Sequence, residues 1–306
     1  MRLKSLFAPS LMALALVAGP AMAETSADPA AARIHAAAQE LVKDSNPARL
    51  EVLKAHLDTL GLAYTLQAFE GGNRQTGPMA GTNIVVTFGE GAQDLVLTAH
   101  YDAVVLRDGS FSHGVVDNAG GTLAAVEAAA ALKAKGGLSG YRLIMVLSDQ
   151  EELGLIGARK WLEQADASRI KAVVNIDVAA YGTTVMYGGN NGEQSRFVNR
   201  LVRQQCADAD RDCEFFQNYP PSDDRVFSAA GIPVVSLGVQ DAKGARQMWL
   251  AFNGGGDSLR EGFVPPVFQN IHTHEDRMDK LVAADVATFS GFVADLLQRI
   301  AAEPAQ

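Results

Sequence analysis

LVLTAHYD, residues 95–102, decides the fold because it joins a short apolar run to a histidine and an aspartate. Two later stretches repeat this arrangement, RLIMVLSDQEE at residues 142–152 and AVVNID at residues 172–177. Short apolar runs that end in polar residues are typical of buried strands. Segments with helical periodicity separate them, and such alternation indicates a largely parallel sheet covered on both faces.

The remaining expected elements continue this alternation. Residues 29–60 have the periodicity of two helices divided at Asn46-Pro47. Gly71-Gly72-Asn73 is expected to link two strands, and Gly254-Gly255-Gly256 with Pro265-Pro266 to mark a long loop. Further strands are expected at 64–69, 82–88, 183–187 and 233–237, and helices at 120–135, 153–164, 195–205 and 283–301. The sequence therefore predicts a three-layer α/β/α sandwich with a mixed, mainly parallel central sheet.

The first 23 residues have the pattern of a secretory signal peptide. Two basic residues precede the apolar run Leu11–Ala18, and Ala21-Met22-Ala23 is a small-x-small cleavage site. The run is too short to span a bilayer, so a retained anchor is the weaker alternative. We expect cleavage after Ala23, a single catalytic domain at residues 24–306, and a periplasmic or secreted location.

Composition narrows the class of partner. The formal net charge is −9, and such an acidic chain is poorly suited to the phosphate backbone of nucleic acid. We expect no nucleic-acid partner and no membrane association after signal cleavage. The two cysteines, Cys206 and Cys213, are close in sequence, and in an exported protein such a pair favours a disulfide over the alternative of two free thiols.

Histidine and acidic side chains are expected to gather at one edge of the sheet. Ligands of open α/β sheets bind beyond the carboxyl ends of the strands. Three strands end there in His100 and Asp102, in Glu151-Glu152, and in Asp177. Several carboxylates in one crevice repel one another unless a cation compensates them. Imidazole and carboxylate ligands suit catalytic zinc, and three carboxylates with one bridging hydroxide would balance two zinc ions.

Two further candidates have ordinary alternatives when taken singly. Asp117, in GVVDNAGG, precedes a helix, so it would also serve as a helix cap. His272, in NIHTHED, lies in a loop, where a histidine is more often a plain surface residue.

Six motifs occur in a fixed order: HYD, GVVDNAGG, EELGLIGARKWL, NID, SDDRVF and IHTHED. They resemble the bacterial leucyl aminopeptidase family of co-catalytic dinuclear zinc exopeptidases, whose relatives include plasma glutamate carboxypeptidase and glutaminyl cyclase. The resemblance extends over residues 82–280. It implies two zinc ions per chain and five ligands, with Asp117 bridging both ions: His100, Asp117, Glu152, Asp177 and His272.

The resemblance also implies roles for three residues that do not bind metal. Asp102 would orient His100, and Glu151 would be the general base. Tyr219, three residues before Ser222, would help stabilise the oxyanion. Many relatives have Ser-Asp-His where this chain has Ser222-Asp223-Asp224, so a common substrate-contacting histidine is absent.

We therefore expect an exported aminopeptidase that acts on peptides with a free N-terminus. A carboxypeptidase on the same scaffold would need a cation for the substrate carboxylate, and Arg225 is the candidate. A glutaminyl cyclase would need one zinc ion and no nucleophilic water. A non-catalytic binding domain would lack ligands or Glu151, whereas this chain retains all of them.

Overall fold

Eight strands form one mixed sheet in the computed structural model, which describes residues 28–254 and 259–304. The strand order is β1-β2-β4-β3-β5-β8-β6-β7. Strands β4, β3, β5 and β8 run parallel at the centre, and β2 and β6 join them antiparallel on either side. The strands are β1 (Tyr64–Asn73), β2 (Gly77–Phe88), β3 (Gln93–His100), β4 (Tyr141–Ser148), β5 (Ile170–Ile176), β6 (Thr184–Gly188), β7 (Cys213–Phe216) and β8 (Val234–Gln240).

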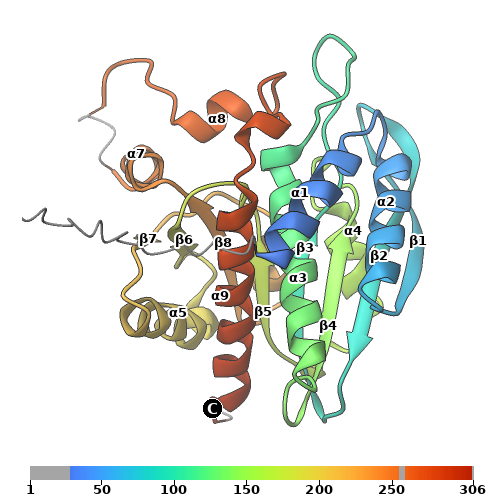
Figure 1. Ribbon diagram of the computed structural model, residues 1–306, viewed down its shortest axis with the longest axis vertical. Coiled ribbons are helices and arrows are strands. Elements are labelled where there is room, and N and C mark those ends of the chain that lie inside the picture. Colours follow the sequence, from blue (N-terminus) through green and yellow to red (C-terminus); the bar gives the residue numbers. More distant parts are fainter. Residues whose placement is uncertain (1–27, 255–258, 305–306) are drawn as a thin grey trace, which may run out of the picture.

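Helices cover both faces of this sheet, and Figure 1 shows α1, α3 and α9 in front of the strands. Two further helices, α7 (Ala242–Phe252) and α8 (Pro266–Asn270), complete the fold. The front layer contains α1 (Pro29–Leu41), α2 (Asn46–Thr59), α3 (Gly120–Ala134), α5 (Arg196–Asp208) and α9 (Ala283–Ala302), and the opposite layer contains α4 (Ile156–Leu162) and α6 (Asp224–Ala229). The predicted three-layer sandwich with a mixed sheet is confirmed.

The central strands are buried on both faces, as their apolar runs predict. Leu95, Val96 and Leu97 of β3 are completely buried, and they contribute to separate apolar clusters on the two sides of the sheet. Because β3, β4 and β5 are parallel, the residues that follow them lie at the same edge. This edge is the upper one in Figure 1, where the loop after β3 and α8 also lie.

Strands β1 and β2 form a longer hairpin than the sequence indicates. The predicted link at Gly71-Gly72-Asn73 is wrong, because these residues continue β1 and the turn falls at residues 74–76. Gly71 provides space here: a Cβ at this position would lie 2.2 Å from Oε1 of Gln150. The glycine thus allows a close approach between the hairpin and the residues after β4.

One other expectation needs correction. The helix expected at 153–164 begins at Ile156, because the preceding residues form a turn in which Gly154 and Leu155 have φ angles of 116° and 60°. The loop expected at Gly254-Gly255-Gly256 and Pro265-Pro266 agrees with the structure, since residues 253–254 and 259–265 form no helix or strand, Pro266 begins α8, and Gly255-Gly256 lies outside the described residues. Four elements were not expected from the sequence, β7, α6, α7 and α8, and three of these are short, with 4 residues in β7, 6 in α6 and 5 in α8.

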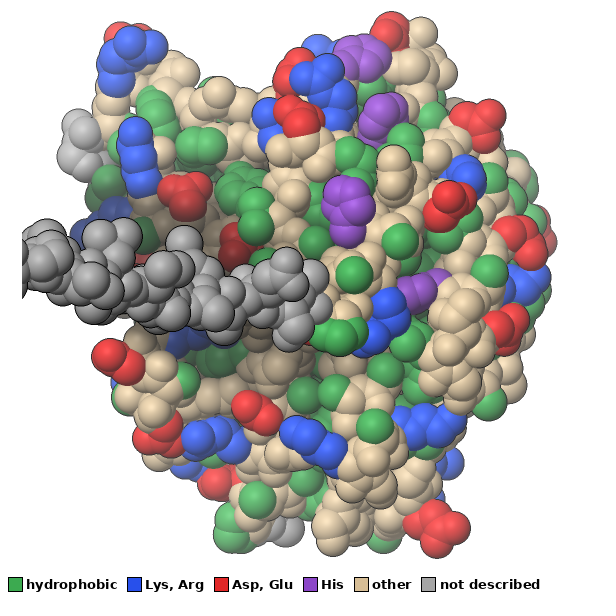
Figure 2. All heavy atoms as spheres, viewed as in Figure 1, with side chains coloured by type: hydrophobic (Ala, Val, Ile, Leu, Met, Phe, Trp, Pro, Cys, Tyr) green, Lys and Arg blue, Asp and Glu red, His purple; other side chains and the backbone are tan. Residues whose placement is uncertain are grey.

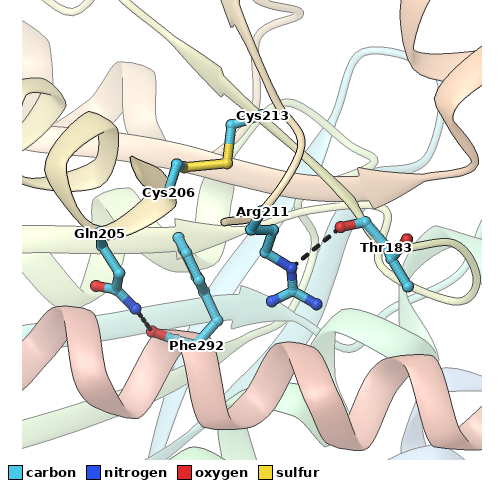
Figure 3. The surroundings of a disulfide bond; sticks show 6 residues. All are labelled: Thr183, Gln205, Cys206, Arg211, Cys213 and Phe292. Atoms are coloured by element: carbon cyan, nitrogen blue, oxygen red, sulfur yellow. Dashed lines mark hydrogen bonds between the residues drawn. A yellow bond between two sulfur atoms is a disulfide. The ribbon is translucent and has the colours of Figure 1, made fainter. Parts of the chain in front are cut away.

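A disulfide joins Cys206 near the end of α5 to Cys213 at the start of β7, as predicted (Figure 3). Neighbouring hydrogen bonds fasten the same region. The Arg211 side chain donates to the carbonyl of Thr183, and Gln205 donates to the carbonyl of Phe292 in α9. The disulfide therefore joins elements other than β3, β4 and β5, the strands that are followed by the candidate site residues.

Two expectations about partners concern membranes and nucleic acids. Across the ranges 28–254 and 259–304, no helix combines the length and the hydropathy needed to cross a membrane. Figure 2 shows basic and acidic side chains interspersed over the face drawn, without a large basic patch. The predicted signal peptide, residues 1–23, lies outside the described residues.

Candidate metal centre

The structure brings together the five side chains proposed as metal ligands, in two groups. The first group contains His100 at the end of β3, Asp177 just after β5, and Asp117. His100 Nε2 lies 3.1 Å from Asp117 Oδ1 and 3.4 Å from Asp177 Oδ1. Two of these side chains thus come from the ends of adjacent parallel strands, where the sequence places them.

The second group shares Asp117 with the first. His272 Nε2 lies 3.1 Å from Asp117 Oδ2 and 3.0 Å from Glu152 Oε2. The two oxygens of Asp117 therefore face different groups, which is the geometry of a carboxylate that bridges two metal ions. Glu151 belongs to neither group.

Asp117 lies in a turn, residues 115–119, that precedes α3. Its side chain does not cap this helix, whose N-cap is Ala119. Asp276 holds this turn in place, because its carboxylate accepts hydrogen bonds from the backbone N–H groups of Val116 (2.6 Å) and Asp117 (3.2 Å). Asp276 ends the IHTHED motif, so the residues after β8 fix the backbone that carries the shared carboxylate.

The loop after β4 is held by a carboxylate and by an amide. Asp102 accepts hydrogen bonds from the backbone N–H groups of Glu151 and Glu152, both at 3.1 Å. Its Oδ1 also lies 3.4 Å from His100 Nδ1. The buried Gln150 side chain accepts from the N–H of Gly72 and donates to the carbonyl of Ala80, so it joins the loop to both strands of the β1–β2 hairpin.

Three residues beside the site have left-handed backbone angles. They are Gln150 (φ 60°), Val178 (φ 60°) and His272 (φ 56°). A β-branched residue is rarely found in this region, and such strain persists only where surrounding contacts hold it. Val178 has those contacts, because its N–H donates to Asn118 and its carbonyl accepts from Val239.

Charge at the site is balanced by hydrogen bonds between acids and imidazoles. Burial alone would raise the pKa of Asp117, but hydrogen bonds with His100 and His272 hold this pKa below its ordinary value. Burial and the nearby Asp117 raise the pKa of Glu152 to about 7. Hydrogen bonds to Asp117 and Glu152 raise the pKa of His272 to about 11. The side chains by themselves thus retain protons that a bound metal ion would replace.

Carboxylate oxygens without a hydrogen-bond partner are a second reason why these residues fit a metal ion. Within the described part of the chain, Glu152 Oε1 and Asp177 Oδ1 are buried without a hydrogen-bond partner. Buried polar atoms are rarely left unpaired, and an ion is one way to satisfy them. Two imidazoles and three carboxylates in groups of three suit zinc with an open coordination position.

A cavity of about 240 Å³ opens beside the two groups. Four acids border it, Asp117, Glu151, Glu152 and Asp177, together with His272. The rest of its wall is mostly apolar and comes from β6, α7, α8 and the loops beside them. Its residues are Val178, Met186, Tyr219, Pro220, Pro221, Met248, Phe252, Val267, Phe268 and Ile271. The site thus combines polar groups on one side with an apolar pocket on the other, as ligand pockets commonly do.

Tyr219, three residues before the SDDRVF motif, lines this cavity, whereas the motif itself does not. Tyr219 is 5% exposed and lines the cavity, and burial raises the pKa of its hydroxyl well above the ordinary value. Asp223 is completely buried and accepts a hydrogen bond from the Ser148 hydroxyl. Asp224 accepts from the N–H of Ser222 and does not line the cavity.

Three residues of the site were not expected from the sequence: Asp276, Gln150 and Asp223. Asp276 lies within a quoted motif, and its spacing from His272 was the available signal. Asp223 likewise lies within the quoted SDDRVF motif, whereas Gln150 gave no signal, because it acts through contacts with the distant β1–β2 hairpin.

Solved structures of similar fold include glutaminyl cyclases and aminopeptidases. A glutaminyl cyclase from Porphyromonas gingivalis is 18% identical, with a TM-score of 0.69 over 88% of this chain and 98% of that one. The aminopeptidase LapA from Legionella pneumophila is 17% identical, with a TM-score of 0.66 over 90% and 72%. A zinc aminopeptidase from Bacillus subtilis is 20% identical, with a TM-score of 0.58 over 73% and 51%.

The family is shown by a direct match of the sequence. The profile of peptidase family M28 matches residues 83–297, which is well over half of the chain. The matched range begins within β2 and ends within α9, and it includes every predicted metal ligand. The chain therefore belongs to peptidase family M28.

Proposed function

We propose that this protein is a zinc aminopeptidase that removes an apolar residue from the N-terminus of peptides. The observation that carries the proposal is a pair of ligand groups sharing Asp117 beside a cavity that is acidic on one side and apolar on the other. Export is part of the proposal, since a bridged cysteine pair is typical of oxidising compartments. A mature chain beginning at Glu24 is the check on export.

The acids of the cavity favour an amine over a carboxylate as the recognised end of the substrate. Among its lining residues in the described ranges, none is a lysine or an arginine. Arg225, the candidate cation for a carboxypeptidase, donates instead to the carbonyls of Asn190 and Tyr219 and does not line the cavity. A free α-ammonium group suits this environment, and a substrate carboxylate would be repelled from it.

The chain's own residues then account for each proton. Two zinc ions held by the two groups would supply Lewis acidity for the scissile carbonyl and lower the pKa of a shared water. Glu151 lines the cavity without joining either group, so its carboxylate is free to take the proton from the attacking water. It then delivers that proton to the leaving amine. Tyr219 also lines the cavity, and its hydroxyl would donate to the developing oxyanion.

A glutaminyl cyclase is the second candidate, because one such enzyme shares the fold over nearly its whole length. Cyclisation releases ammonia from N-terminal glutamine and needs no attacking water. The second ligand group and the apolar wall formed by Met186, Met248 and Phe268 favour hydrolysis of an apolar N-terminal residue instead.

The proposal is tested with a panel of fluorogenic aminoacyl amides and peptides. Leucyl and phenylalanyl amides should be hydrolysed, and a chelator should abolish this activity until zinc is restored. N-acetylated leucyl amide should be inert because it lacks the free amine. Conversion of glutaminyl peptides to the cyclised product without hydrolysis of any amide would replace the proposal with the cyclase. Cleavage of N-blocked peptides from their C-terminus would replace it with the carboxypeptidase.

The apolar wall predicts the effect of Phe268→Ala. We expect kcat/KM to fall about tenfold for leucyl and phenylalanyl amides, because an apolar contact of this size is lost. It should change little for alanyl amide, whose side chain does not reach the wall. Val264→Ala is the matched control, since Val264 is 45% exposed on the adjoining loop and does not line the cavity. An equal loss on all three substrates would argue against a specificity role for Phe268.

A further inference from the structure

Arg49 in α2 is a completely buried arginine. Its guanidinium group donates four hydrogen bonds, and every acceptor is a backbone carbonyl. The carbonyls belong to Tyr101 (2.7 Å), His113 (2.8 Å), Leu41 (3.1 Å) and Gly114 (3.2 Å). No carboxylate of the described residues pairs with it, although buried arginines are usually paired with acids.

The positions of these carbonyls connect Arg49 to the metal centre. Tyr101 lies between His100 and Asp102, and Gly114 immediately precedes the turn that carries Asp117. One planar guanidinium therefore bridges the segment that follows β3 and the segment that precedes α3. These are the two segments that must be in register for His100 and Asp117 to lie 3.1 Å apart.

The fork shape of the side chain explains why an arginine occupies this position. A guanidinium presents several N–H donors in a fixed plane, whereas a lysine presents one compact ammonium group. The site is tightly built: a Cβ on Gly114 would lie 2.6 Å from Ala103 Cβ and 3.3 Å from Arg49 Nη1. Burial lowers the pKa of Arg49 to about 10, with nearby Asp102 and Asp276 acting in the opposite direction, so the group stays charged at neutral pH.

We propose that Arg49 is a positioning residue of the metal centre, which holds the His100 and Asp117 segments in the geometry that zinc binding requires. This inference rests on the proposed zinc site and extends it to α2, which lies outside the range matched by the family profile. The first helices of the domain are thus part of the metal-binding framework as well as a cover for the sheet.

The test is zinc affinity, measured by competition with a chromophoric chelator on Arg49→Lys and Arg49→Met. We expect both variants to bind zinc about 10 to 100 times more weakly, the usual effect of losing a group that orients metal ligands. Arg49→Lys retains the charge and loses the fork, so a wild-type affinity in this variant would overturn the proposal. Activity should recover when zinc is added in excess.

Arg33 provides the matched control. It is also an arginine that fastens the helical layer, through two hydrogen bonds (3.0 and 2.6 Å) from α1 to Glu127 of α3, and Glu127 is its only side-chain partner among the described residues. Arg33→Met should leave zinc affinity unchanged even if it lowers the melting temperature. An equal loss of affinity in this variant would mean that Arg49 acts only through general stability.

A third variant guards against a folding defect. Arg49→Ala opens a space that free guanidinium ions would fill, so low millimolar guanidinium should restore zinc affinity, and the same concentration of urea should not. Failure of this rescue in a folded variant would count against the proposal. The wild-type protein separates the two proposals, because absence of zinc binding there would refute the zinc site itself, whatever the Arg49 variants do.

Discussion

Asp117→Asn is expected to lose most of both zinc ions, because Asp117 is the one described side chain that belongs to both ligand groups. Each carboxylate oxygen faces a different histidine, at 3.1 Å in both cases. Asparagine keeps the shape but turns an N–H₂ group toward one metal position and removes the charge shared by both. Elemental analysis should fall from near two zinc ions per chain to below one, with activity lost by more than about 100-fold.

Two single-group variants make this prediction specific. Asp177→Asn should weaken only the ion held with His100, and Glu152→Gln only the ion held with His272. Both should retain about one zinc ion per chain and recover activity in part when zinc is added. If Asp117→Asn instead retained full metal content and turnover, Asp117 would have only a structural role in its turn, and the shared centre would be wrongly assigned.

The fold and the gathering of the site residues were predictable for the same physical reason. A buried parallel strand has no polar face, so it appears as an unbroken apolar run, and the first polar residues after it mark its carboxyl end. Leu95–Thr98 followed by His100 shows this plainly, as does Ile176 followed by Asp177. The position of these residues along the chain therefore contained most of the information about their position in space.

Residues that act through long-range contacts were not predictable in this way. Arg49 illustrates the limit, because with Leu53 and Leu57 it forms the buried stripe of α2 at four-residue spacing. An arginine that heads an otherwise apolar stripe was the available signal. What such a group would bind depends on two loops more than 50 residues away, and no local pattern specifies that.

The prediction of a link at Gly71-Gly72-Asn73 was wrong for a related reason. Glycine indicates a turn when only the local chain is considered. Gly71 instead makes room for the Gln150 side chain, and a Cβ on Gly81 would likewise approach Gln150 Nε2 to 2.7 Å. The need for glycine comes from a side chain almost 80 residues away, so the correct interpretation required the tertiary structure.

Glu151→Gln should reduce kcat by roughly two to four orders of magnitude while metal content stays near normal. Glutamine keeps the shape of Glu151 but cannot accept the proton of the attacking water, and general acid–base catalysis usually contributes about that much. Burial raises the pKa of Glu151 well above its ordinary value, which suits a group that must hold a proton briefly between two steps. KM should change much less, because substrate binding does not require the proton transfer.

The neighbouring glutamate is the internal control for this experiment. Both backbone N–H groups donate to Asp102, so the two residues belong to the same fixed loop, but only Glu152 belongs to a ligand group. Only Glu152 lies within reach of His272, at 3.0 Å. Glu152→Gln should therefore lose activity through loss of one zinc ion, and added zinc should restore part of it, whereas added zinc should not help Glu151→Gln. The opposite pattern would exchange the two roles, and near-normal turnover in Glu151→Gln would require another group to take the proton from water.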